Sequence, residues 1–252
     1  MEEIVSIKNV TKSFYSQKDK FLSFKKKKIE VLNNINLELK KGEITAILGP
    51  NGSGKTTLFK LISTLLIPNK GRVNVSGFDT IKNPINVRKV TSFVTSEERS
   101  FYFRLTGKQN LLFFATLCNL KKRETLERIK FFSSFLKLDD HINIKYQEYS
   151  TGLKQKLNLA RGLIRDFSIL LLDEPIKSVD PKTSSEILEY FKETLVKKMG
   201  KTLIMTTHNI KEIENFADRF IVLNKQSVVA DIKKEKIGAG GLSDIYKIYV
   251  KN

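Results

Sequence analysis

The stretch Gly49-Pro50-Asn51-Gly52-Ser53-Gly54-Lys55-Thr56-Thr57 has the residue pattern of a phosphate-binding loop. An apolar, partly β-branched run at 44–48 precedes it and predicts a buried parallel strand. Apolar residues recur at helical spacing from Leu58 to Leu65, so we expect a helix to begin inside the stretch. A strand, this loop and a helix, in that order, are the context that the pattern requires.

The residue types in the stretch suit the binding of phosphate. Its glycines let the backbone approach phosphate oxygens, and successive N–H groups at a helix N-terminus point at an anion. Lys55 adds a cation for the β- and γ-phosphates, and the Thr56 hydroxyl is suited to ligate Mg²⁺. The alternative is an ordinary glycine turn ahead of a helix, but every position of the pattern is filled. We therefore predict a nucleotide-binding protein.

Composition limits the class of protein. The 252 residues suffice for one large α/β domain or two small ones, and 40% of them are apolar. No run approaches the ~20 apolar residues that span a bilayer, and the start lacks a secretion signal, so we expect a soluble or peripheral protein. The net charge of +18 indicates an anionic partner, whether lipid headgroups, nucleic acid or nucleotide. The single Cys118 lies in an apolar stretch and is expected to pack in the core.

The order of apolar patterns predicts an α/β fold. Strands are expected at 4–10 and 35–39 in a front sheet, at 73–75, and at 90–94, 169–172 and 202–206, with a long amphipathic helix at 183–199. Between 96 and 149 the pattern is helical and rich in phenylalanine. We predict one phosphate-loop NTPase domain over 1–252. Residues 1–95 and 151–252 would form a mostly parallel core sheet with an antiparallel front β subdomain, residues 96–150 a helical subdomain, and the end after Gly241 a short tail.

An unusual lysine-rich insert occupies residues 16–28, between the first two predicted strands. Its lysines surround Phe21, Leu22 and Phe24. Two interpretations stay open, a solvated loop and a contact with an anionic membrane surface through lysines and interleaved aromatic rings.

Two adjacent acids, Asp173 and Glu174, end the predicted strand at 169–172. The carboxyl end of a parallel strand beside the loop strand is the usual ligand position in an open α/β sheet. There Asp173 would lie by Mg²⁺ and Glu174 would polarise the attacking water; the alternative is a purely structural cap of the strand. His208 ends the next strand and is a candidate γ-phosphate contact, although a lone histidine also occurs as a packing residue.

These motifs together resemble the nucleotide-binding subunits of ATP-binding-cassette transporters over nearly the whole chain. The segment Tyr149-Ser150-Thr151-Gly152-Leu153-Lys154-Gln155-Lys156 is similar to the signature sequence of that family, with Thr151 and Leu153 departing in a way that resembles exporter subunits. Lys177 to Pro181 is similar to the D-loop, and Thr206-Thr207-His208 is similar to the switch histidine. Phe14 occupies the position of the aromatic residue that stacks on adenine.

The resemblance implies ATP and Mg²⁺ as cofactors, and it assigns roles to particular residues. The implied catalytic residues are Glu174, His208 and Lys55, and the implied Mg²⁺ ligands are Thr56 and Asp173. The implied nucleotide-binding residues are Phe14, Gly49, Pro50, Asn51, Gly52, Ser53, Gly54, Lys55, Thr56, Thr57, Ser150, Thr151, Gly152 and Asp180. One departure concerns the glutamine that usually follows the strand at 91–94, because this chain has Ser96 followed by Glu97 there.

The resemblance also implies partners. Two such subunits would dimerise head to tail, so that the signature of one meets the ATP of the other, and would drive export by a permease on another polypeptide at the cytoplasmic face of the membrane. The main alternative is a soluble cassette ATPase acting on nucleic acid or the ribosome, which the positive charge would suit. Against it, the chain holds one cassette and lacks room for a long coiled coil. A regulatory module without turnover is disfavoured by the intact Glu174.

Overall fold

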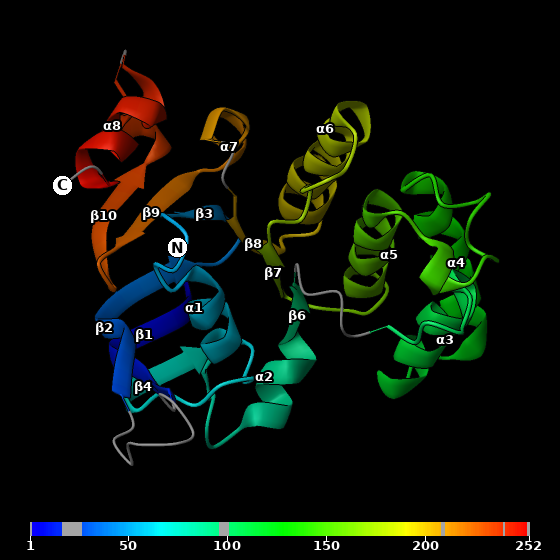
Figure 1. The fold of residues 1–252 in the computed structure, drawn as a ribbon, viewed down its shortest axis with the longest axis horizontal. Coiled ribbons are helices and arrows are strands. Elements are labelled where there is room, and N and C mark those ends of the chain that lie inside the picture. The colour runs from blue at the N-terminus through cyan, green and yellow to red at the C-terminus, as the bar shows by residue number, and fades with distance from the viewer. Residues whose placement is uncertain (1, 17–26, 96–100, 208–209, 239, 251–252) are drawn as a thin grey trace, which may run out of the picture. The chain divides into compact units, whose positions relative to one another are not determined.

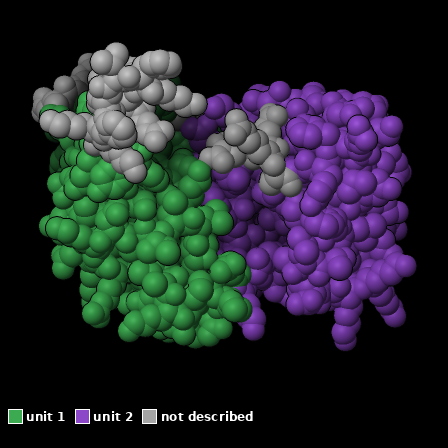
Figure 2. Space-filling view, turned by 60° about the horizontal axis from the view of Figure 1, so that its bottom comes forward, with its two compact units in different colours: residues 1–88, 206–252 green, residues 89–205 purple. Residues whose placement is uncertain are grey.

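The computed structural model describes residues 2–16, 27–95, 101–207, 210–238 and 240–250. They form two compact units, which are drawn in green and purple in Figure 2. Unit 1 comprises residues 1–88 and 206–252, and unit 2 comprises residues 89–205. Within the described ranges, no helix is both long and apolar enough to cross a membrane. Most of the insert at 16–28, together with Ser96, Glu97 and His208, lies outside the described residues.

Unit 1 contains an antiparallel sheet with the order β2(Lys27–Lys40), β1(Glu3–Ser16), β4(Lys70–Val75) and β5(Phe78–Asp79). Ile7 of β1 lies opposite Leu37 on one side and Val73 on the other, and all three side chains are buried. The predicted front sheet is therefore confirmed. Its first two strands are longer than the apolar runs because pairing continues to Ser16 and Lys27, past the exposed side chains of Phe14 and Tyr15.

The second sheet of unit 1 supports the phosphate-binding loop. The strand β3(Ile44–Leu48), buried along its whole length, pairs in parallel with β9(Arg219–Asn224). Antiparallel pairing then joins β9 to β10(Ser227–Lys233). The helix α1(Lys55–Ile62) follows the loop, as predicted (Figure 1). Two further helices, α7(Ile210–Phe216) and α8(Gly241–Val250), and a 3₁₀ turn at Lys234–Lys236 also belong to this unit.

Unit 2 combines strands with the predicted helical region. Its strands follow the order β8(Thr202–Thr206), β7(Ile169–Asp173) and β6(Thr91–Val94), and β6 and β7 are parallel. The helix α2(Pro84–Val90) leads into β6. The phenylalanine-rich region forms α3(Gly107–Leu117), α4(Lys122–Phe135) and a 3₁₀ turn at Tyr146–Glu148, followed by α5(Thr151–Leu163). The predicted helix at 183–199 begins as α6(Pro181–Glu189) and continues as a π-helical segment, Tyr190–Lys198.

Two expectations are wrong. Cys118 is exposed rather than packed in the core, because α3 ends at Leu117 and buries its other face, around Leu111 and Ala115. The residues after Gly241 form a helix instead of a tail, because Leu242 is fully buried and its backbone N–H donates to Glu214 Oε1 at 2.7 Å. The helical subdomain at 96–150 stays a prediction, since unit 2 also holds β6, β7 and α6.

Candidate functional site

The phosphate-binding loop of unit 1 has a backbone that only glycine allows at two places. Gly49 has φ 152°, and a Cβ there would overlap the backbone carbonyl oxygen of Leu223 on β9. Gly54, the residue before α1, has φ 103°, and its Cβ would lie 2.5 Å from Leu32 Cδ2. The loop is therefore packed closely against β9 and β2 of its own unit.

The loop gathers positive charge and hydrogen-bond donors at the N-terminus of α1. Lys55 is only 7% exposed, and its Nζ donates to the carbonyl oxygens of Gly49 at 2.7 Å and Pro50 at 2.9 Å. The first turn of α1 contains no acidic residue. Ser53 Oγ is buried and has no hydrogen-bond partner within the described residues. A helix N-terminus with a held ammonium and an unused hydroxyl suits a phosphate group.

Phe14 lies on β1, and β2 is the strand next to it that packs against the loop. Phe14 is 38% exposed, and Lys12 Nζ lies 5.2 Å from the centroid of the Phe14 ring. Lys12 pairs across the sheet with Leu32, which is the residue that packs against the Gly54 position. The pairing of β1 with β2 therefore places Phe14, two residues after Lys12, on the strand beside the one that contacts the loop.

The acidic pair of unit 2 stands at the end of β7, as predicted. Asp173 is the last residue of the strand and is 4% exposed. Glu174 follows with φ 52°, a backbone conformation that is uncommon for residues other than glycine. Its carboxylate lies 3.1 Å from Lys177 Nζ, and 16% of the Glu174 side chain is exposed. The carboxylate of the expected base is thus accessible and paired with a cation.

The signature-like segment is joined to the same part of unit 2. Ser150 caps α5, because its Oγ accepts a hydrogen bond from the backbone N–H of Leu153 at 3.3 Å. Gln155 Nε2 donates to the backbone oxygens of Glu174 at 3.2 Å and Pro175 at 2.8 Å. At Gly152, a Cβ would lie 2.7 Å from the carbonyl oxygen of Ser178. The N-terminus of α5 is therefore held against the backbone that follows β7.

Asp180 completes this group of residues. Its Oδ1 accepts from the backbone N–H of Thr183 and caps α6, while Oδ2 lies 3.2 Å from Nζ of the buried Lys156 on α5. The hydrogen bonds from Thr183, together with Lys156, hold the pKa of the Asp180 carboxyl well below its usual range. A permanent negative charge at this place ties α6 to α5.

The structure thus gathers two sets of predicted residues, one in each unit. Unit 1 holds the loop from Gly49 to Thr57 with Phe14, and unit 2 holds Ser150 to Gly152 with the acidic pair and Asp180. Sequence reasoning missed Lys177 as a neighbour of Glu174 and did not place Gln155 at the acidic pair. Only the spacing of Lys177, three residues after Glu174, could have indicated the ion pair.

Comparison with known proteins agrees with these motifs. The family model described as ABC transporter matches residues 32–177. The ABC transporter ATP-binding protein NatA of Bacillus subtilis strain 168 is 36% identical over 205 residues, which are 81% of this chain and 82% of NatA. The doxorubicin resistance ATP-binding protein DrrA of Mycobacterium tuberculosis H37Rv is 29% identical over 209 residues, 83% of this chain and 62% of DrrA.

Solved structures show the same relationship. A dimeric, post-hydrolysis state of the ATP-binding cassette MJ0796 bound to ADP and Pi has a TM-score of 0.81 and 28% identity, covering 92% of this chain and 99% of that one. The span matched by the family model contains both the phosphate-binding loop and the acidic pair, and it exceeds half of the chain. The chain therefore belongs to the ABC transporter family, as an ATP-binding subunit that hydrolyses ATP.

Proposed function

We propose that this subunit powers an exporter, working as a head-to-tail dimer with a permease on a separate polypeptide. The resistance function in the name of DrrA and the departures Thr151 and Leu153 support export. The dimeric MJ0796 cassettes support the dimer. The solved structure of cbiO1 from Clostridium perfringens, which is 25% identical with a TM-score of 0.73 over 94% of this chain and 90% of cbiO1, is described as part of the ABC transporter complex cbiONQ. Attachment through a permease would place the chain at the cytoplasmic face of a membrane.

The nucleotide would be held by unit 1. The loop from Gly49 to Thr57 would receive the phosphates, with Lys55 near the β- and γ-phosphates and Phe14 stacked on the adenine. Lys55 can turn to phosphate oxygens from the carbonyls that it now contacts, because its Nζ has three donors.

Two residues have the ligand chemistry of a Mg²⁺ ion that would bind together with the nucleotide. Mg²⁺ takes one or two protein oxygens plus phosphate oxygens, and the Thr56 hydroxyl of unit 1 and the buried Asp173 carboxylate of unit 2 are oxygens of the kind it takes. When bound, the ion would neutralise charge on the phosphates. Glu174 would orient and polarise water, and His208, which lies outside the described residues, would contact the γ-phosphate.

The partner subunit's nucleotide would meet the N-terminus of α5. Ser150, Thr151 and Gly152 begin this helix of 13 residues, whose dipole favours a negative group at that end. Asp180 would stand beside them, fixed by Lys156. The observation that carries the proposal is the pair of hydrogen bonds from Gln155 to the backbone at Glu174 and Pro175. They couple the helix that would sense a partner's phosphate to the backbone of the hydrolytic carboxylate.

The test uses Glu174→Gln, which keeps the shape of the side chain but removes the base. Turnover should fall by about 100-fold or more, ATP affinity should change little, and ATP should accumulate a dimer on size-exclusion chromatography. Wild-type specific activity should rise with protein concentration. Full activity of Glu174→Gln, or a monomer that hydrolyses ATP at a constant specific rate, would overturn the composite site.

The proposed binding to a permease is tested with inside-out membranes of the host that have been stripped of peripheral proteins. The wild-type chain should rebind saturably, and protease treatment of the membranes should abolish rebinding. Equal binding to protein-free vesicles of the same lipids, or no rebinding, would contradict a protein receptor in the membrane.

A further inference from the structure

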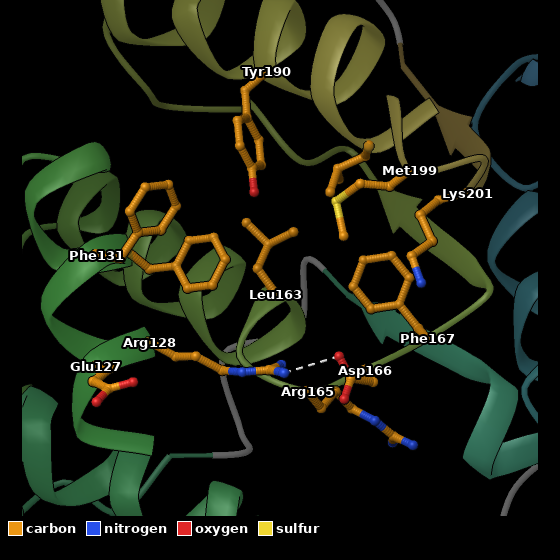
Figure 3. Close-up of a pocket in the computed structure, with 12 residues that line it drawn as sticks. Glu127, Arg128, Phe131, Leu163, Arg165, Asp166, Phe167, Tyr190, Met199 and Lys201 are labelled. Carbon is orange, nitrogen blue, oxygen red and sulfur yellow. Dashed lines mark hydrogen bonds and ion pairs between the residues drawn. The ribbon is translucent and has the colours of Figure 1, made fainter. Parts of the chain in front are cut away.

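Unit 2 contains a cavity that has no part in the site described above. Its volume is about 340 Å³, and it lies between α4, the end of α5 and the π-helical segment (Figure 3). The apolar side chains that line it include Phe131, Leu163, Phe167 and Met199. This size falls at the lower end of the range of roughly 300–1,000 Å³ for small-molecule sites. The cavity has room for a compact molecule rather than a long lipid chain.

Most charged groups at the edge of the cavity already have partners. Arg128 lies 2.6 Å from Glu124 and 2.9 Å from Asp166, and it also donates to the carbonyl oxygen of Ile164. Glu127 pairs with Arg123 at 3.1 Å. Both acids of the edge are therefore neutralised by arginines of the protein itself.

Lys201 differs from these residues because it is not in an ion pair with a described carboxylate. Its Nζ lies 5.7 Å from the centroid of the Phe167 ring, and within the described ranges it has no carboxylate at ion-pair distance. An ammonium over an aromatic face at the edge of an apolar cavity attracts an anion more than a cation. Arg165, another cation of the lining, donates to the carbonyl oxygen of Lys89 at 3.4 Å. Lys201 is thus the lining cation that lies against an aromatic ring of the wall, and it gives the cavity its charge preference.

Tyr190 adds a hydrogen-bond donor. In Figure 3 its hydroxyl points from the π-helical segment toward Leu163, in the interior of the cavity. The hydroxyl makes no hydrogen bond to any described residue, and burial raises the pKa of Tyr190, so it stays a protonated donor at neutral pH. A donor that is half-buried without a partner gains from a ligand oxygen.

The wall that carries Tyr190 has an uncommon backbone. Tyr190–Lys198 is π-helical, with Leu195 on the cavity side and Met199 directly after it. Segments of π-helix are rare and occur often at functional sites, where they change the direction of side chains. The π-helical wall therefore supports a functional role for the cavity independently of the cavity volume and of the charges at its edge.

We propose that this cavity binds a small aromatic carboxylic acid. The carboxylate lies at the ammonium of Lys201, the ring lies among Phe131, Leu163 and Met199, and a ligand oxygen accepts a hydrogen bond from Tyr190. The charge of Lys201 selects an acid over its neutral or cationic analogues. Arg128, Glu127 and Asp166 do not take part in this selection, because each is held in an ion pair of the protein itself.

The test measures binding of three probes of equal size to the full chain by isothermal titration calorimetry. They are 1-naphthoate, the neutral 1-naphthalenemethanol and the cationic 1-naphthalenemethylamine. Naphthoate should bind at least tenfold tighter than either analogue. Absence of naphthoate binding at millimolar concentration, or equal binding of naphthoate and the alcohol, would overturn the proposal.

Variants locate the site. Lys201→Gln should weaken naphthoate binding about tenfold and leave the alcohol unchanged, whereas Lys198→Gln, a change of the same charge on the exposed end of the π-helical segment, should alter neither. Met199→Trp should fill the cavity and remove binding of both probes. Tyr190→Phe, which keeps the ring, should weaken only ligands that carry a further oxygen outside the carboxylate, such as 4-hydroxy-1-naphthoate. Unchanged naphthoate affinity in Lys201→Gln or in a folded Met199→Trp would place the binding elsewhere.

Discussion

The ammonium of Lys177 lies 3.1 Å from a carboxylate oxygen of Glu174, the residue that we propose as the catalytic base. The two side chains differ in exposure, at 68% for Lys177 and 16% for Glu174. Glu174 also has φ 52°, so its backbone adopts an uncommon conformation at the same place. A carboxylate that must turn to a water molecule has to leave this ammonium. The ion pair with Lys177 therefore opposes the orientation in which the Glu174 carboxylate contacts water.

Lys177→Gln should raise kcat for ATP up to about fivefold, because an ion pair whose lysine is open to solvent contributes about 1 kcal/mol. Steady-state ATPase rates at saturating ATP measure the change. Lys182→Gln, which removes the same charge from the exposed first turn of α6, should leave kcat unchanged. A tenfold fall in kcat for Lys177→Gln would show that the lysine assists catalysis instead of restraining it.

The core of this fold could be predicted from the sequence wherever burial governs the residue types. The strands β3 and β7 consist of apolar runs buried on both faces, so their predicted positions agree with the structure within one residue. The N-cap Ser150 is of the same kind, because a small polar residue before an amphipathic run is typical of the start of a helix.

Other elements have no local residue pattern that predicts them. The strands β9 and β10 join through Lys225 and Gln226, which both have positive φ, at 44° and 69°. Asparagine and glycine usually fill such turns, so nothing in this pair of residues indicates a hairpin. In the site, the motif residues were named from the sequence, but the contacts of Gln155 and Lys177 with the Glu174 segment depend on tertiary packing of long polar side chains. No periodicity encodes such contacts.

Lys55→Ala should weaken ATP binding at least tenfold. The change removes a cation from the phosphates and also the two hydrogen bonds that hold the Gly49 and Pro50 carbonyls. Calorimetric Kd values for ATP and for ADP measure the loss, which should be larger for ATP if the ammonium lies near the γ-phosphate. Unchanged ATP affinity would contradict the role of the loop.

Gly152→Asp should abolish hydrolysis while ATP affinity of the monomer stays within about threefold, because the carboxylate would face the γ-phosphate held by the partner subunit. Gly152→Ala is the matched control. It introduces the same Cβ, 2.7 Å from the Ser178 oxygen, without the charge, so it should lose part of the activity only. If both variants lose activity equally, the steric contact with Ser178 rather than charge accounts for the effect. Full activity of Gly152→Asp would make the N-terminus of α5 purely structural.

A last prediction concerns two glycines with nearly the same φ angle, Gly71 on β4 and Gly77 in the turn between β4 and β5. Gly71 and Gly77 have φ 82° and 81°, so alanine costs about 1–2 kcal/mol of conformational strain at either place. They differ in surroundings. A Cβ at Gly77 meets nothing within 4 Å, whereas a Cβ at Gly71 would overlap the backbone oxygens of Lys8 and Asn9 on β1.

Gly71→Ala should therefore lower the free energy of unfolding by about 1–3 kcal/mol more than Gly77→Ala does. Urea unfolding of the full chain, followed by circular dichroism, measures both values under the same conditions. The strand β1 pairs with β4 on one side and with β2 on the other, and Leu32 of β2 packs against Gly54 of the phosphate-binding loop. Because a displaced β1 would shift β2, Gly71→Ala should also reduce ATP affinity. Equal destabilisation by the two substitutions would mean that β1 yields freely, and ATP affinity should then be the same in both variants.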